Sequence, residues 1–143
     1  MSAVDYHDIG DDIASHLQTK LGTGYLCTSS QSAALQYSEQ GIGVVVLFNG
    51  FRHMEELSQT VAPTRDADFR IGIAARGDSD DAIIEKLTDT LSAIEYILNV
   101  DHAAPPFGHF EIERVIATDG EIVELPTLGY VGRITATVRI MEV

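Results

Sequence analysis

The stretch ADFRIGIAARGDSDDAII, residues 67–84, marks the point where a strand is followed by a helix. In its first half, apolar residues alternate with polar or small ones, which is typical of a half-buried strand. From residue 80 onward, a helix of about five turns is predicted because apolar residues recur at intervals of three and four: Ile83, Ile84, Leu87, Leu91, Ile94, Ile97 and Leu98. We therefore expect Gly77 to form the turn and Asp78 or Ser79 to cap the helix.

The same stretch contains Arg76-Gly77-Asp78-Ser79, the tetrapeptide of integrin-type adhesion ligands, and a cluster of acids that could bind a hard metal ion. An adhesion motif must project from an exposed loop, whereas here Asp78 or Ser79 is needed at a helix start. Asp78, Asp80 and Asp81 lack the alternating ligands, the later glycine and the closing glutamate of a helix-loop-helix calcium site. We interpret the tetrapeptide as the beginning of a helix and expect no metal there.

The residues before this stretch predict a helix and two strands. Residues 3–22 carry one apolar stripe on an acidic helix that Gly22 ends, formed by Ile9, Ile13, Leu17 and Leu21. Residues 24–30, GYLCTSS, are expected to form a short strand, and a polar loop follows. The uninterrupted apolar run Val44–Phe48 favours a strand buried on both faces.

Residues 52–65, RHMEELSQTVAPTR, are the least regular part of the sequence. Their charges are mixed, and Pro63 argues against a strand or helix that continues through them. The stretch is expected to be a long loop or an extended arm.

The C-terminal third predicts three strands, over residues 109–118, 121–125 and 129–143. Asp119-Gly120 lies between the first two, and Asp-Gly between strand-like runs is a strong hairpin signal. The expected fold class is therefore α+β, in the order α-β-β-β-α-β-β-β. We expect two amphipathic helices packed on one face of a largely antiparallel sheet.

The composition indicates one folded, acidic domain. The chain has 143 residues, of which 45% are hydrophobic, and a formal net charge of -13. This length suits a single domain spanning 1–143, and no apolar run is long enough for a membrane span. A negative surface disfavours binding to duplex DNA, and it is explained either by solubility or by adaptation to a high-salt host.

The sequence offers no pattern for catalysis, a cofactor or a metal centre. The histidines show no metal-binding spacing: His7, His16, His53, His102 and His109. Cys27 lies in an expected strand and is interpreted as a small core residue. Ser29-Ser30 belongs to no nucleophile elbow, and no phosphate-binding loop is present. We therefore expect a protein that is not an enzyme and binds no cofactor.

The strands carry apolar or small residues on both faces, which is more surface than two helices on one face can cover. The second face of the last strand is an example, with Val131, Thr135, Thr137 and Met141. This surface is expected to be buried either against other subunits or beneath residues 52–65.

Taken together, the order of these elements resembles the tail-terminator, or tail-completion, proteins of long-tailed viruses. The resemblance extends over nearly the whole chain, and it rests on pattern and size without an invariant motif. It is carried by the N-terminal helix, GIGVVVLFNGF, DADFRIGIAAR, DSDDAIIEKLTDTLSAIEYIL and YVGRITATVRIMEV.

The resemblance implies a hexameric ring that caps the tail tube, ends its polymerisation and provides the surface for head or neck attachment. The implied partners are other copies of the chain, the tail-tube protein and a neck or head-completion protein, while DNA passes through the lumen without specific binding. The implied location is the head-proximal end of the virion tail, after assembly in the host cytoplasm. Within this model, candidate residues for subunit or tube contacts are Arg52, Glu55, Glu56, Arg65, Arg133 and Arg139.

The sequence also departs from the shortest relatives of that family. Pro105-Pro106 and the expected hairpin at residues 116–126 lengthen its C-terminal half. A neck or head-tail adaptor of similar fold therefore remains an alternative. The alternative from another class is a small acidic α+β ligand-binding protein or enzyme.

Overall fold

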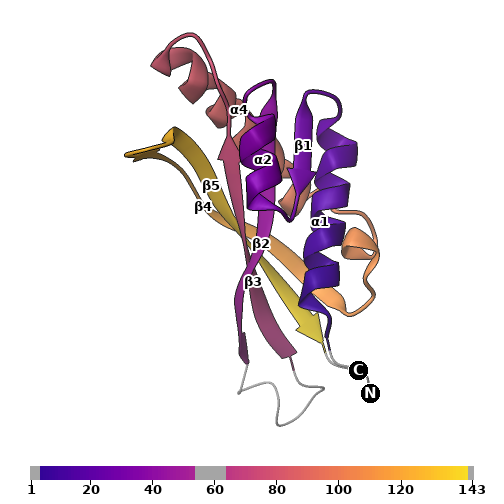
Figure 1. Ribbon diagram of the computed structural model, residues 1–143. Helices are drawn as coiled ribbons and strands as arrows, with labels where there is room; N and C mark the ends of the chain where they lie inside the picture. Colours follow the sequence, from indigo (N-terminus) through magenta and orange to yellow (C-terminus); the bar gives the residue numbers. More distant parts are fainter. Residues whose placement is uncertain (1–3, 54–63, 142–143) are drawn as a thin grey trace.

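The computed structural model describes residues 4–53 and 64–141. Figure 1 shows the path of the chain. The elements are α1 (Tyr6–Leu21), β1 (Tyr25–Thr28), α2 (Gln31–Tyr37), β2 (Ile42–His53), β3 (Thr64–Ala74), α4 (Asp80–Asn99), the 3-10 turn η1 (Pro106–Gly108), β4 (Ile112–Leu125) and β5 (Gly129–Met141).

The strands form one five-stranded sheet with the order β1-β2-β3-β5-β4. β1 runs parallel to β2, and the other neighbouring pairs are antiparallel. The expected α+β class with a largely antiparallel sheet is therefore confirmed.

One face of the sheet, here called the inner face, carries the hydrophobic core. The inward positions of β2, β3 and β5 pair in register, for example Val46 with Ile71 and Ile71 with Ile134. Buried residues of α1 and α4 belong to the same cluster. Its fully buried side chains include Ile9, Ile13, Leu17, Val44, Val46, Phe69, Ile71, Ile73, Leu87, Ile94, Leu98 and Ile140.

The end of α1 and the start of α4 follow the sequence signals. Asp5 accepts a hydrogen bond from the Asp8 backbone amide at 3.0 Å, and α1 ends at Gly22 with φ 83°. At α4, the Ser79 hydroxyl accepts from the Ala82 amide at 3.2 Å. The expectation that Arg76–Ser79 leads into a helix is thus confirmed.

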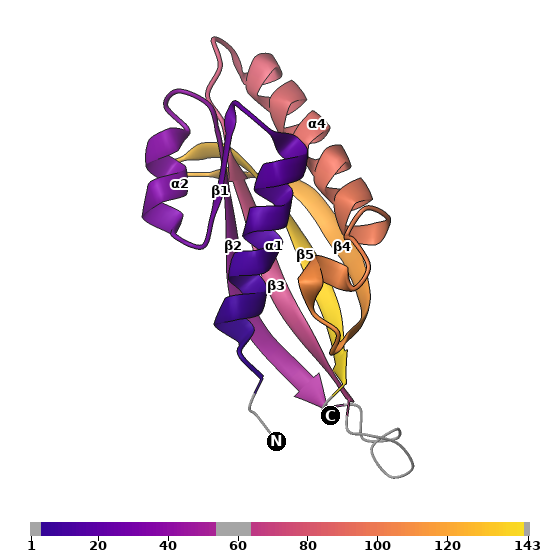
Figure 2. The same ribbon diagram turned by 90° about the vertical axis from the view of Figure 1, so that its right-hand side faces the viewer.

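The short helix α2 lies where a polar loop was expected. Ser30 caps it by accepting from the Ala33 amide at 3.3 Å. A Cβ on Gly43 would come within 2.0 Å of the Ala34 carbonyl oxygen, so glycine is what lets the helix backbone contact β2. Because Gly43 alternates with the inward-facing Val44, this contact lies on the opposite face, here called the outer face. Figure 2 shows α2 and α4 on opposite sides of the sheet.

The Asp119-Gly120 hairpin was predicted wrongly. Residues 112–125 form the single strand β4, which pairs with β5 on both sides of a register shift between Thr118 and Glu121. Asp119 adopts a φ of 59°, which aspartate tolerates in a β-bulge as well as in a tight turn. The chain instead reverses at residues 126–128. The C-terminal third therefore forms two strands, β4 and β5, where three were expected.

The expected loop or arm at residues 52–65 is partly strand. Arg52 and His53 end β2, while Thr64 and Arg65 begin β3, and His53 pairs with Arg65. Pro63, Glu55 and Glu56 lie in 54–63, outside the described residues. The expectation of a strand buried on both faces holds for Val44–Val46 only, since Leu47 is 37% exposed and Phe48 is 42% exposed.

Candidate assembly surface on the outer face of the sheet

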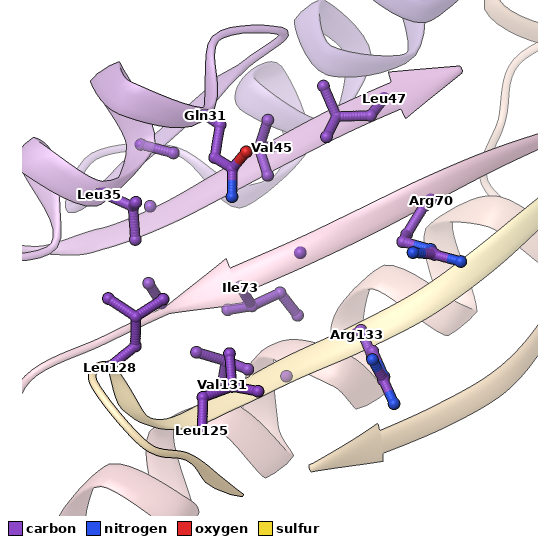
Figure 3. A pocket seen from close by; sticks show the side chains of 15 residues that line it. Gln31, Leu35, Val45, Leu47, Arg70, Ile73, Leu125, Leu128, Val131 and Arg133 are labelled. Atoms are coloured by element: carbon purple, nitrogen blue, oxygen red, sulfur yellow. The ribbon is translucent and has the colours of Figure 1, made fainter. Parts of the chain in front are cut away.

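The outer face carries a groove between α2 and the turn that joins β4 to β5. We call it the outer groove; its volume is about 190 Å³. Figure 3 shows side chains from β2, β3 and β5 around it. Its aliphatic walls are formed by Leu35, Val45, Leu47, Leu125, Leu128 and Val131.

The groove has room at its base because Gly72 has no side chain there. Gly72 lies on β3 and pairs with Val45 on β2. A Cβ at Gly72 would lie 3.2 Å from Cγ1 of Val45, closer than an ordinary contact. The groove is therefore a consequence of small residues on the strands between larger aliphatic ones.

Two arginines mark one end of the groove. In Figure 3, Arg70 and Arg133 lie at one end, and Leu35 and Leu128 lie at the other. Arg133 Nε donates to Glu121 Oε1 at 2.7 Å. Arg70 is exposed and forms no hydrogen bond or ion pair with any residue that the structure describes. Asp119 and Glu121 line the space beside the two arginines, so this end of the groove carries charges of both signs next to an apolar surface.

Farther along the same face, ion pairs connect three strands. Arg139 donates to both carboxylate oxygens of Asp66, at 2.9 and 3.3 Å. These hydrogen bonds raise the pKa of Arg139 above its usual value. Asp68 accepts from Arg52 and from the Thr137 hydroxyl, the latter at 2.9 Å. This part of the outer face is therefore held by polar contacts.

Arg65 is directed to the other side of the sheet, next to an aromatic cluster. It donates to the Tyr6 hydroxyl at 2.8 Å, and its guanidinium carbon lies 5.2 Å from the centroid of the Phe51 ring. Tyr6 stacks on Phe48 with ring centroids 4.5 Å apart. Arg65 thus joins α1 to the β2–β3 pair within the chain.

The six candidate residues from the sequence therefore do not form one surface. Arg52, Arg133 and Arg139 share the outer face, and Arg65 belongs to the inner face. Glu55 and Glu56 lie outside the described residues. Arg70 was not among the candidates from the sequence. Its position in an alternating strand, between Phe69 and Ile71, nevertheless indicates that it faces away from the core.

The structure also contains a partly buried histidine cluster that no pattern in the sequence indicated. His109 contacts Asp12 Oδ2 through Nε2 at 2.6 Å and Glu111 Oε1 through Nδ1 at 2.9 Å. Burial alone lowers the pKa of His109, but the hydrogen bonds to Glu111 and Asp12 outweigh it, and the net pKa is raised. Asp12 lies 97 positions away in the sequence, so no local spacing could indicate this contact.

The described part of the chain holds one buried cysteine, and its acidic residues form no cluster of metal ligands. Burial raises the pKa of the Cys27 thiol to about 12, so the thiolate needed for nucleophilic attack is disfavoured. No group of three or more His, Cys, Asp or Glu side chains is arranged to hold a metal ion among residues 4–53 and 64–141.

No helix within those same two ranges is long and apolar enough to cross a membrane. Neither protein-family models nor curated protein sequences give a match to this chain. The candidate surface is therefore interpreted from its own geometry.

Proposed function

We propose that this chain is a structural virion protein, a ring-forming tail terminator that caps the tail tube and provides the surface for head or neck attachment. The observation that carries the proposal is the unequal covering of the sheet. α1 and α4 bury the inner face, whereas the outer face has the short α2 at one end and leaves an aliphatic groove. A subunit of a ring needs such unsatisfied surface for its neighbours.

The long β2–β3 pair also supports the proposal. The two strands have 12 and 11 residues and stay paired as far as His53 and Arg65. Figure 1 shows this pair extending beyond β1 and α2. An extension of this kind can reach a neighbouring subunit or the tube in a ring.

The acidic charge suits a ring through which DNA passes. With 22 acidic and 9 basic residues, each subunit repels the phosphate backbone at long range. A lumen built from such subunits would let DNA move without holding it.

A second candidate is a small ligand-binding protein, and the outer groove favours it. An aliphatic groove with Arg70 at one end has the chemistry to hold a small anion with an apolar part. This candidate predicts saturable binding by a monomer or dimer, while the terminator predicts flat subunit contacts around a hole. A neck or head-tail adaptor shares the ring and differs in its position.

The test is the mass and shape of the purified full chain, by light scattering and negative-stain microscopy at low and high salt. Both salt conditions are needed because six copies bring 6 × (-13) charges together, a repulsion that dilute buffer screens poorly. A six-membered ring with a central hole is expected in at least one condition. A monomer or dimer in both, which also fails to bind the tail-tube protein encoded in the same genome, would reject the proposal.

A further inference from the structure

We propose that β4 receives an extended basic segment of another protein along its free edge at residues 120–125, here called the distal edge. The segment adds a strand to the sheet, with a lysine or arginine side chain beside Glu124. This contact does not depend on the proposed ring, because a single copy of the chain carries the whole distal edge.

The other edge of the sheet is already occupied by a side chain. β1 and β4 lie at opposite ends of the strand order, as Figure 2 shows. At the four-residue β1, Gln18 Nε2 donates to the Tyr25 carbonyl oxygen and Gln18 Oε1 accepts from the Cys27 amide, each at 2.9 Å. Gln18 thus takes the place that a neighbouring strand would have, which is one way in which proteins protect an exposed edge.

β4 has 14 residues and a similar protection at Ala117. The Ala117 amide donates to Asn99 Oδ1 at 2.8 Å, so it points away from β5. In an antiparallel pair, opposite residues alternate between those that bond to each other and those that do not. Since Ala117 is opposite Ala136, the odd-numbered residues of β5 bond to β4, while the even-numbered ones bond to β3.

Beyond the bulge, the backbone of Ile122 and Glu124 points to the free edge. These two residues are opposite Gly132 and Tyr130, which are even-numbered residues of β5. No side chain of the described residues forms a hydrogen bond with the amide or carbonyl group of either. Unpaired groups in a row are a template for an added strand, whose main-chain hydrogen bonds provide affinity.

The charges around the distal edge favour a basic partner. Glu124 is exposed. The pKa of the Tyr130 hydroxyl is raised by the charge of Glu124 first and by Asp80 of α4 second, with a smaller effect of Asp81. The three carboxylates thus lie around one hydroxyl, and none of them forms an ion pair with a cation of the described residues. A cationic side chain beside Glu124 is attracted by all three.

The two sides of the added strand meet different surfaces. A Cβ on Gly132 would lie 3.5 Å from Leu91 of α4, so Gly132 is on the inner face. By alternation Glu124 is on that face too, whereas Val123 and Leu125 are on the outer face. The expected partner therefore alternates, with basic residues on the inner face and apolar residues on the outer face.

A second copy of the chain is a poorer occupant. Pairing of residues 120–125 with the same segment of another copy brings Glu121 and Glu124 of both chains into one short ladder. Asp80 and Asp81 of both copies add to this charge, and like charges on neighbouring strands are destabilising. The acidity of the distal edge therefore points to a different protein.

The experiment measures the binding of a synthetic peptide to the full-length protein by fluorescence anisotropy. The peptide is Thr-Lys-Val-Lys-Val-Lys-Thr with a fluorescent label. Its valine amides are N-methylated, which leaves the lysine amides free to bond to β4 and prevents the peptide from forming a sheet with itself. One control carries the N-methyl groups on its lysine amides instead, with the same charge. The other control replaces each lysine by glutamate.

We expect saturable binding of the first peptide, and binding weaker by about tenfold or more for both controls. Hydrogen exchange followed by NMR locates the peptide. The amides of Ile122 and Glu124 should exchange about fivefold more slowly when it is bound. The amide of Val123 already bonds to β5, so its exchange should change by less than about twofold.

The chain itself supplies a matched pair of variants. Glu124→Lys is expected to weaken binding by about tenfold or more, with Glu124→Gln as a second variant should the first not fold. Glu95→Lys changes the net charge equally at an exposed position of α4, and it should change the affinity by less than about twofold. Circular dichroism establishes that each variant is folded.

Several results would overturn the proposal. Equal binding of the two N-methylated lysine peptides means that no strand is added, and equal binding of the glutamate peptide removes the basic partner. An affinity that Glu124→Lys leaves unchanged moves the contact away from the distal edge, and no binding at all removes it. A wild-type dimer whose Ile122 amide is protected without peptide makes a second copy the occupant. The ring is tested separately, because none of these measurements changes the mass or shape expected for the wild-type assembly.

Discussion

The inner and outer faces of the sheet are made by the same strands and differ in what covers them. On the inner face, Phe69, Ile71 and Ile140 are fully buried beneath α1 and α4. On the outer face, the same strands carry Asp66, Arg70 and other polar groups, and among the described helices α2 covers one end. The inner face therefore holds the hydrophobic core, while the outer face is less covered in the part of the chain that the structure describes. This difference can be tested one side chain at a time.

The largest effect is expected from the inner face. Phe69→Ala removes a fully buried ring that contacts the helix α1 at Gly10, and we expect it to lower the free energy of unfolding by about 3–5 kcal/mol. The control is Leu47→Ala on the outer side of β2, where the side chain is 37% exposed and the expected loss is below about 1 kcal/mol. Urea unfolding measures both. Equal losses for the two variants would mean that the outer face is as well covered as the inner one.

The second effect concerns the helix on the outer face. Gly43→Ala places a methyl group 2.0 Å from the Ala34 carbonyl oxygen, so α2 must move away from β2. We expect a loss of about 1–3 kcal/mol, together with faster hydrogen exchange in residues 31–37. The control is Gly120→Ala, because a Cβ there would lie 3.6 Å from Ile134, an ordinary contact. Unchanged exchange in α2 would contradict the close contact on which one wall of the outer groove depends.

The third effect concerns the ion pairs beside the groove. Asp66→Asn removes the charge that holds Arg139, whose side chain is only 20% exposed, and we expect a loss of about 1–2 kcal/mol in urea unfolding. The control is Glu39→Gln, which removes an exposed pair with Arg76 and should cost below about 1 kcal/mol. If both variants cost the same, the ion pairs on the outer face are solvated to the same degree as an isolated surface pair.

The inner face could be predicted from the sequence because its signals are local and repeated. Two patterns extend over several periods: the apolar stripe of Ile9, Ile13 and Leu17, and the alternation around Phe69. Both patterns follow from burial of the apolar side chains on one face. Ser79 could be proposed as one of two caps because its position follows from where the apolar period of α4 begins.

The outer face could not be predicted in the same way. α2 has seven residues and buries only Ala34, so no apolar stripe marked it as a helix. Asp119-Gly120 suits a bulge and a hairpin equally. It forms a bulge because the residues before and after it all pair with β5. The walls of the outer groove come from separate elements, and the partners of Arg52 and Arg139 depend on strand register. None of these is a property of a short stretch of sequence.

The smallest effect tests a polar cluster that fastens the η1–β4 connection to α1. His109 lies between Asp12 and Glu111, and its pKa in the folded protein is raised above the ordinary value of about 6.5. A raised pKa in the folded state means that the protonated imidazole interacts more favourably with its surroundings in the folded protein than in the unfolded chain. Its contribution is therefore fully present below about pH 6.5 and is lost as pH rises through the folded pKa.

We accordingly expect His109→Gln to lower the free energy of unfolding at pH 5.5 and to have a smaller effect at pH 8.5, with a difference below about 1 kcal/mol. The difference between wild type and variant is the quantity to measure, because the 22 acidic residues give both proteins their own dependence on pH. His7→Gln is the matched control, since His7 pairs with Asp11 while its side chain is 78% exposed. A His109→Gln effect that grows with pH would show that the neutral imidazole is the form this cluster stabilises, because only that form would then contribute above the pKa.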